Sequence, residues 1–202
     1  LRVSDKGQAL FFDTRTGAQL KRVDLPVPAG ASITAIGSDQ PGSPLMVLGL
    51  SDGRALVFHH SYKITYPDNK KTITPDIDYP YGQAPLRLDE QGRALEHVGL
   101  NRSGDTLLLA GSTGAQLQVL SLSSSENMLT GEVSTEQARI VLPQMAETVK
   151  NIFIDPRQQW LYVINGRATA DVFSLRDKSL NGRYQLLDDG NAEIPASGQV
   201  WA

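Results

Sequence analysis

The stretch TLLLAGSTGAQLQVL, residues 106–120, contains the pattern that decides the fold. Residues 106–111 form a continuous apolar run of strand length, which is typical of a strand buried on both faces. Residues 112–114 supply small side chains and a glycine that tolerates positive φ, as a tight hairpin turn requires. Beyond the turn, Gln116 and Gln118 alternate with apolar residues, which indicates a strand with one face toward solvent.

This unit of apolar strand, glycine turn and alternating strand occurs four times. The copies lie within residues 4–13, 45–58, 106–120 and 160–174, and their turn glycines are Gly7, Gly53, Gly114 and Gly166. These glycines are 46, 61 and 52 residues apart, and propeller blades repeat about every 40–50 residues. Another strand and turn precede the third and fourth copies, so each repeat contains a meander. The sequence predicts an all-β fold, a β-propeller or partial propeller of about four recognisable four-stranded antiparallel blades.

The domain organisation follows from the same spacing. We expect residues 1–202 to form a single propeller-like domain excised from a longer protein, because the chain begins at Leu1 and ends at Ala202 without features of natural termini. The longest interval between turns contains an insertion, residues 66–93, within or between blades. Residues 121–131 are rich in serine and predict a loop between blades.

Composition excludes several classes of protein. The net charge is −3, and 20% of the residues are charged, which argues against a nucleic-acid binder with a basic face. The chain has no cysteine, which excludes disulfides, thiolate metal sites and cysteine nucleophiles. No apolar run reaches the length that spans a bilayer. A chain of 202 residues can bury a core without such cross-links.

Two stretches resemble a known family. Residues 154–163 resemble the strand, turn and Leu-Tyr-Val element of WD40-like and YVTN-type β-propellers, and residues 100–122 resemble the same element. The Trp-Asp dipeptide and the Gly-His start of WD40 repeats are absent. The resemblance covers most of the chain and implies an architecture, not an activity, because propellers host many functions.

A narrower resemblance concerns the whole segment. It is similar to the propeller-like insertion domain of some bacterial phosphate ABC-transporter permeases. That resemblance implies a non-catalytic accessory domain that mediates protein–protein interaction or regulation of transport. It further implies a place on the periplasmic side of the inner membrane, with transporter subunits or the substrate-binding protein as partners. The alternatives are a free-standing scaffold propeller, which would allow a cytoplasmic location, and a metal-dependent hydrolase of lactonase type.

The insertion contains the candidate contact residues. Tyr62, Tyr66, Tyr79 and Tyr81 cluster within it or beside it, among four prolines. Tyrosine-rich loops suit protein contacts because each ring offers a large area at low entropic cost. The alternative is an extended hairpin in which the tyrosines form cross-strand pairs on their own blade.

Metal and catalytic sites find less support in the sequence. His59 and His60 are adjacent, so on a strand they point to opposite faces, and His97 is remote. A lactonase-type cation site would need acidic residues at the central channel; the candidates are Asp76, Asp78, Asp155, Asp188 and Asp189. Aspartate in turns also serves to bond its own backbone. Nucleophile-elbow and phosphate-loop motifs are absent. We therefore expect no enzyme activity, no cofactor and no metal.

Overall fold

The computed structural model describes residues 1–126 and 133–186. These residues form β-strands and one short 3-10 helix, η1 (Pro67–Asn69). The strands are β1 (Arg2–Val3), β2 (Gln8–Phe12), β3 (Gln19–Asp24), β4 (Ile33–Ser38), β5 (Leu45–Leu50), β6 (Arg54–Thr65), β7 (Thr72–Asp78), β8 (Leu86–Arg87), β9 (His97–Ser103), β10 (Thr106–Thr113), β11 (Gln116–Glu126), β12 (Val133–Ile140), β13 (Val149–Ile154), β14 (Trp160–Asn165), β15 (Thr169–Ser174) and β16 (Ser179–Gln185). No helix in these two ranges has the length and apolar character needed to cross a membrane.

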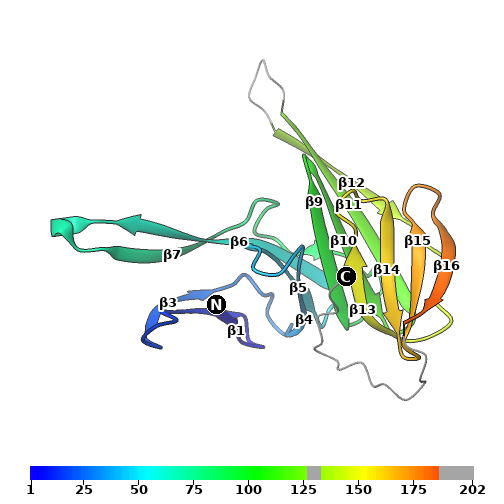
Figure 1. The fold of residues 1–202 in the computed structure, drawn as a ribbon, viewed down its shortest axis with the longest axis horizontal. Coiled ribbons are helices and arrows are strands. Elements are labelled where there is room, and N and C mark those ends of the chain that lie inside the picture. Colours follow the sequence, from blue (N-terminus) through cyan, green and yellow to red (C-terminus); the bar gives the residue numbers. More distant parts are fainter. Residues whose placement is uncertain (127–132, 187–202) are drawn as a thin grey trace.

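The strands form four antiparallel sheets, which we call blades 1 to 4 (Figure 1). Blade 1 has the order β1-β2-β3, and blade 2 the order β4-β5-β6-β7, with β8 also paired to β6. Blade 3 has the order β12-β11-β10-β9, and blade 4 the order β13-β14-β15-β16. Within each blade, apart from β8, each strand therefore pairs with the next along the chain. This arrangement confirms the predicted all-β fold of about four blade-like antiparallel units.

The first strands of blades 2, 3 and 4 lie side by side, with β9 between β4 and β13. Two glycines allow this close approach. A Cβ atom on Gly37 of β4 would lie 2.5 Å from the carbonyl oxygen of Val98, and one on Gly99 of β9 would lie 3.0 Å from that of Ile152. Side-chain carbon atoms do not approach a backbone oxygen so closely without displacing it. Glycine at these two positions therefore sets how tightly the inner strands can pack.

Three apolar cores lie between successive blades. The run in β10 shows how they form: Leu107 and Leu109 belong to the core with blade 2, whereas Leu108 and Ala110 belong to the core with blade 4. Successive strand residues point to opposite faces, so a strand covered on both sides must be apolar throughout. Phe11 and Phe58 anchor the core between blades 1 and 2. Burial of each such side chain contributes about 1.5–3 kcal/mol.

The segments that connect one blade to the next are hydrogen-bonded to a predicted glycine turn of the preceding blade. The amide of Leu25 donates to the carbonyl of Gly7 (2.7 Å), and the amide of Asp89 donates to that of Gly53 (2.8 Å). Val149 makes the equivalent bond to Gly114 (3.3 Å). The turns therefore close the hairpins and also fix the connections between blades.

One predicted loop is wrong in its first half. Residues 121–126 belong to β11, which pairs with β12 from Val119 to Glu126. Ser121 and Ser123 alternate with the buried Leu122, so the period-two pattern of a strand continues through the serine-rich stretch. An outer pair of strands needs only one apolar face, and serine on the other face is compatible with pairing. Residues 127–131, the second half of the predicted loop, lie outside the described residues.

Residues 66–93, predicted as an insertion, contain η1, β7, β8 and the connection toward blade 3. They complete a long hairpin with β6 and then return to the turn at Gly53. Whether they are an insertion relative to other propellers stays a prediction.

The Gly37→Ala substitution tests the close approach of the inner strands. We expect it to lower the free energy of unfolding by about 1–3 kcal/mol, the usual range for overpacking a filled site, measured by urea denaturation. Gly166→Ala is the matched control, because the atom nearest to its added Cβ is Lys150 Cε at 3.8 Å. Equal losses of stability in the two variants would contradict the proposed packing of β4 against β9.

Candidate protein-contact groove

A two-stranded arm extends from blade 2. Strand β6 pairs with β5 only as far as His59, opposite Leu45, but its pairing with β7 continues to Thr65. We define the arm as residues 61–76, which includes η1 at its tip. Figure 1 shows the arm reaching away from the blades, beside blade 1. The arm is therefore a hairpin whose outer part has no third strand.

The two faces of the arm differ in chemistry. Cross-strand pairing places His60 opposite Ile77, Tyr62 opposite Pro75, and Ile64 opposite Ile73. Because these pairs are two residues apart along each strand, their side chains share one face. The intervening pairs, Ser61 with Asp76, Lys63 with Thr74 and Thr65 with Thr72, form a polar face. The arm is thus an amphipathic ribbon.

The base of the apolar face packs on blade 1. Phe11 meets Tyr62 edge to face with ring centroids 5.8 Å apart, and it meets His60 at 6.5 Å. Edge-to-face ring pairs contribute about 0.5–1.5 kcal/mol beyond the area they bury. Burial lowers the pKa of His60, since the charged imidazolium is poorly solvated there. The neutral ring is the form that suits this contact.

Lys21 of β3 holds the outer edge of the arm. Its ammonium donates to the carbonyl of Pro75 (2.9 Å) and pairs with the Asp76 carboxylate at 3.2 Å. This interaction contributes to the lowered pKa of Asp76. Both charged groups are partly exposed, so the ion pair itself adds little stability. Its effect is to position β7 next to β3.

Beyond these contacts, a groove separates the arm from the hairpin of β2 and β3. It has a volume of about 570 Å³. Its lining residues are Phe12, Asp13, Thr14, Arg15, Leu20, Tyr62, Lys71 and Ile73. Leu20 reaches the groove because the pairing shifts between Phe11 and Phe12, which leaves Leu20 without an opposite residue. A bulge of this kind redirects a side chain.

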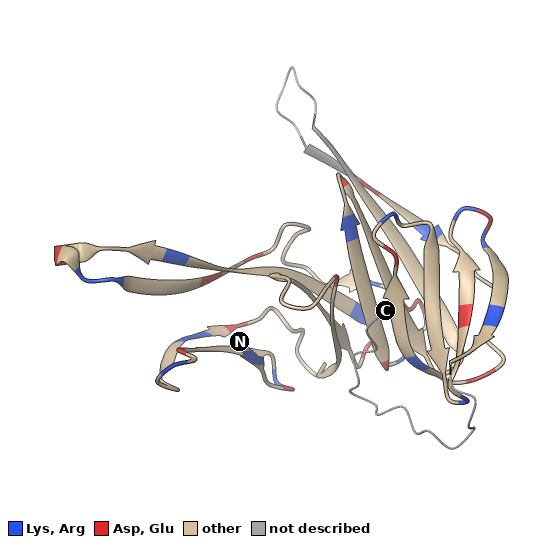
Figure 2. Cartoon of the chain, in the orientation of Figure 1, with Lys and Arg blue, Asp and Glu red and all other residues tan. Residues whose placement is uncertain are grey.

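The charged side chains around the groove differ in whether they have a bonding partner. The Asp13 carboxylate accepts hydrogen bonds from the amides of Arg15 (2.8 Å) and Thr16 (3.2 Å), and these bonds lower its pKa. Within the described ranges, Arg15 and Lys71 form no ion pair. Figure 2 shows basic segments on the arm near its tip. The groove lining therefore carries two cations without an ion pair and one ionised aspartate, which is bonded by its own loop and stabilised by the nearby charge of Arg15.

The four predicted tyrosines do not form one cluster. Tyr62 lines the groove, and Tyr66 lies at the tip with 65% of its surface exposed. Tyr79 and Tyr81 are half-buried against two different cores, and burial raises the pKa of each hydroxyl. Tyr62 faces Pro75 across the hairpin, so it forms no tyrosine pair there. Whether any of the four contacts a partner stays a prediction.

Sequence reasoning missed every lining residue of the groove except Tyr62, namely Phe12, Asp13, Thr14, Arg15, Leu20, Lys71 and Ile73. A signal for the arm was present, since apolar residues alternate through residues 60–64 and 73–77. That alternation predicts two strands with a shared apolar face. The contribution of blade 1 has no such local signal, because it lies about fifty residues earlier in the chain.

The candidate metal residues are dispersed. His59 lies near Asp78, with Nδ1 and Oδ2 3.4 Å apart, whereas His60 lies on the opposite face. Asp155 accepts from the amides of Gln159 (2.6 Å) and Trp160 (2.7 Å), which is a turn role. Among the described residues, no group of three or more histidine or acidic side chains is placed to hold a metal ion. Asp188 and Asp189 lie outside the described residues.

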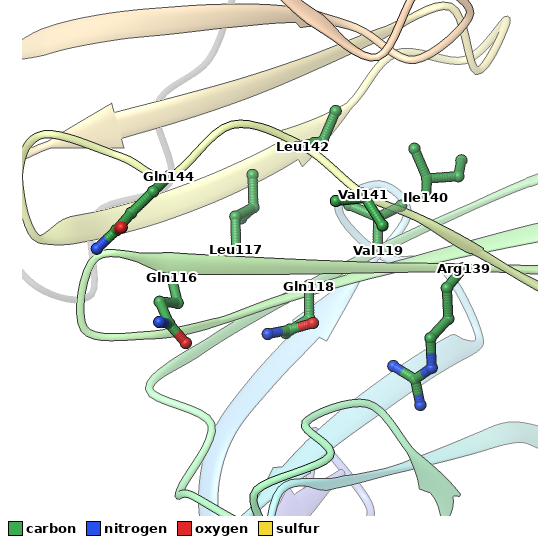
Figure 3. Close-up of a pocket in the computed structure, with 9 residues that line it drawn as sticks. All are labelled: Gln116, Leu117, Gln118, Val119, Arg139, Ile140, Val141, Leu142 and Gln144. Carbon is green, nitrogen blue, oxygen red and sulfur yellow. The ribbon is translucent and has the colours of Figure 1, made fainter.

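A second, smaller hollow lies on blade 3 and has a volume of about 270 Å³. Figure 3 shows Gln116, Gln118 and Arg139 on one side of β11 and Leu117 and Leu142 on the other. The side chains of Gln116, Gln118 and Arg139 are already engaged by the fold. Arg139 donates to the backbone carbonyls of residues 87 and 88, both at 2.8 Å, and Gln116 accepts from Arg93.

The buried Asp89 organises this junction between blades 2 and 3. It is 1% exposed and pairs with the Arg93 guanidinium at 2.7 Å. The side-chain bond from Arg93 holds the pKa of Asp89 below its ordinary value. These contacts connect the chain entering blade 3 to β11, so the smaller hollow is part of the structural framework.

Comparisons with known proteins bear on the fold. No protein-family profile and no curated protein matches the chain. A solved structure that is similar is the β-propeller domain of Myceliophteria thermophila Cps50 (Swd1), with a TM-score of 0.53 and 10% sequence identity. The match covers 92% of this chain and 50% of that one, so this chain spans about half the neighbour's length. At this identity the likeness shows a β-propeller fold and nothing finer.

Acidification tests the contact at the base of the groove. Because burial lowers the pKa of His60 from 6.5, the unfolded chain binds the proton more readily, so stability is full above pH 6.5 and falls below it. We expect His60→Phe, which keeps a ring beside Phe11, to reduce this pH dependence between pH 7.5 and 5.5. His60 is a single titratable group, so it accounts for a difference of less than one bound proton between the unfolded and folded chains.

The measurement is the midpoint of urea unfolding across that pH range. His97, whose pKa burial also lowers, keeps its own contribution in both proteins, so the difference reports His60. An unchanged pH dependence in the variant would contradict the burial of a neutral His60.

Proposed function

We propose that this chain is a non-catalytic β-propeller module that binds another protein through the arm and the groove. One observation carries the proposal: the outer part of the arm presents an apolar face to solvent. Tyr62, Ile64 and Tyr66 are 46%, 50% and 65% exposed. A contiguous exposed apolar patch marks an interaction surface more often than a scattered residue does.

The construction of the arm supports the same conclusion. A two-stranded ribbon without a third strand or a packed face is only marginally stable in water. The outer arm nevertheless keeps an apolar face that its own blade does not cover, and aromatic residues there suit an interface. A protein partner that covers this face would bury apolar area and add order to the ribbon.

The finer hypothesis assigns the module to a bacterial phosphate ABC-transporter permease. It rests on the sequence resemblance alone, and it carries the proposals of a periplasmic location and of transporter subunits or a substrate-binding protein as partners. The free-standing scaffold requires none of these. Fractionation of cells that contain the full-length protein separates the two: the permease hypothesis predicts a membrane protein whose propeller is protease-accessible from the periplasm.

The main proposal is tested by photo-cross-linking followed by binding measurements. A benzophenone amino acid at position 64 of the full-length protein, in its own cells, should form an adduct with a partner that mass spectrometry identifies. With that partner purified, the double variant Ile64→Ser and Tyr66→Ser should bind at least tenfold more weakly, as expected for truncated interface anchors.

The matched control is Leu180→Ser with Tyr184→Ser, two exposed apolar residues of β16 with 46% and 54% exposure. The proposal expects the control to bind as the unmodified protein does. A partner that tolerates the arm variant, or that is lost with the β16 variant instead, contradicts a contact through the arm.

A further inference from the structure

The walls of the groove are largely apolar, and one of them includes a residue of the edge strand β7. Phe12 and Leu20 come from the hairpin of blade 1, and Tyr62 and Ile73 come from the arm. Strand β7 is the last strand in the order of its sheet, so the backbone groups on its outer edge have no further strand of that sheet to pair with; of these, the Pro75 carbonyl accepts from Lys21. Such an edge favours a ligand in an extended conformation, which can add hydrogen bonds along it.

The charge at the rim selects among such ligands. Arg15 and Lys71 form no ion pair within the described residues, whereas Asp13 is engaged by two backbone amides. Asp76, the next acid along β7, is paired with Lys21. The lining therefore carries two cations without an ion pair and one aspartate that stays ionised, which leaves it a net charge of +1, although the whole chain has a net charge of −3. Carboxylates are the complementary groups, and arginine can bind them with two parallel bonds.

The composition of the groove lining disfavours two other anionic ligands, nucleic acids and small inorganic anions. Nucleic-acid binding draws its affinity from many phosphate contacts, and two cations beside an apolar wall supply few. A small inorganic anion would leave Phe12, Leu20 and Ile73 without a role. The volume of about 570 Å³ is within the range of sites that enclose several side chains or a small ligand.

We infer that the groove binds an extended acidic segment of a protein partner, with apolar side chains against Tyr62, Leu20 and Ile73 and carboxylates at Arg15 and Lys71. This inference rests on the proposed function, since it specifies the chemistry of the partner at the same surface.

The probe is a display library of random twelve-residue peptides, selected on the purified chain. We expect the enriched peptides to combine aspartate or glutamate with leucine, isoleucine, phenylalanine or tryptophan. A synthetic enriched peptide, labelled for fluorescence anisotropy, should bind at least tenfold more weakly to the double variant Arg15→Glu and Lys71→Glu. Its affinity should also fall as salt rises, since the charges are exposed.

The control is Lys63→Glu with Arg176→Glu, which makes the same change in net charge away from the groove; Lys63 lies on the polar face of the arm and Arg176 in blade 4. We expect less than a twofold loss there. Ile73→Ser tests the apolar wall and should also weaken binding at least fivefold. Circular dichroism confirms that each variant is folded, and Arg15→Gln with Lys71→Gln replaces the charge reversal if that variant does not fold.

Every outcome is decisive. Enriched peptides that are neutral or basic, the absence of enrichment, or equal losses in the groove and control variants overturn the inference. If the cross-link from position 64 identifies a partner while the peptides fail, the proposed function stands and only the acidic specificity is wrong. If position 64 forms no cross-link and no peptide binds at the groove, the proposed function and the acidic specificity are both wrong.

Discussion

A strand that is apolar on both faces must be covered by a sheet on each side, and β10 imposes this constraint on the rest of the chain. Leu107 and Leu108, adjacent in sequence, belong to different cores, so blade 3 is stable only between blades 2 and 4. Gly37 and Gly99 let the inner strands approach closely enough for this stacking. The connections then return across the turns, where the carbonyls of Gly7, Gly53 and Gly114 accept their amides.

The arm differs from the stacked blades because no sheet covers the faces of its outer part. Strand β6 continues past the end of β5, and its apolar face is covered by blade 1 only near Phe11. Farther out the same face is exposed, and a groove separates it from Leu20 and Phe12. The feature that distinguishes this chain from a plain stack of blades is therefore also the surface available to a partner.

The sequence predicted the parts of the structure that have a local cause. The glycine turns at Gly7, Gly53 and Gly114, the meanders and the doubly buried strand all follow from patterns within about fifteen residues. In the fourth turn the prediction for Gly166 is wrong, because Ala168 takes the positive φ there. The groove could not be predicted in this way, because residues 12–20 meet residues 62–73 only after blade 1 packs on blade 2. The tyrosines illustrate the limit: they cluster in sequence, yet the hairpin places Tyr62 at the groove and Tyr79 against a core. Composition also misled, since the serines of β11 are typical of a loop.

Native-state hydrogen exchange tests the account most directly, because it separates the stacked blades from the arm within one sample. Amides of β9 and β10, which lie between neighbouring sheets, should exchange only through global unfolding and share its free energy. Amides of residues 61–65 and 72–74 should exchange orders of magnitude faster, through local opening of a ribbon with no third strand. Equal protection of the arm and of β10, or fast exchange throughout β9, would contradict both the stacking and the exposed arm.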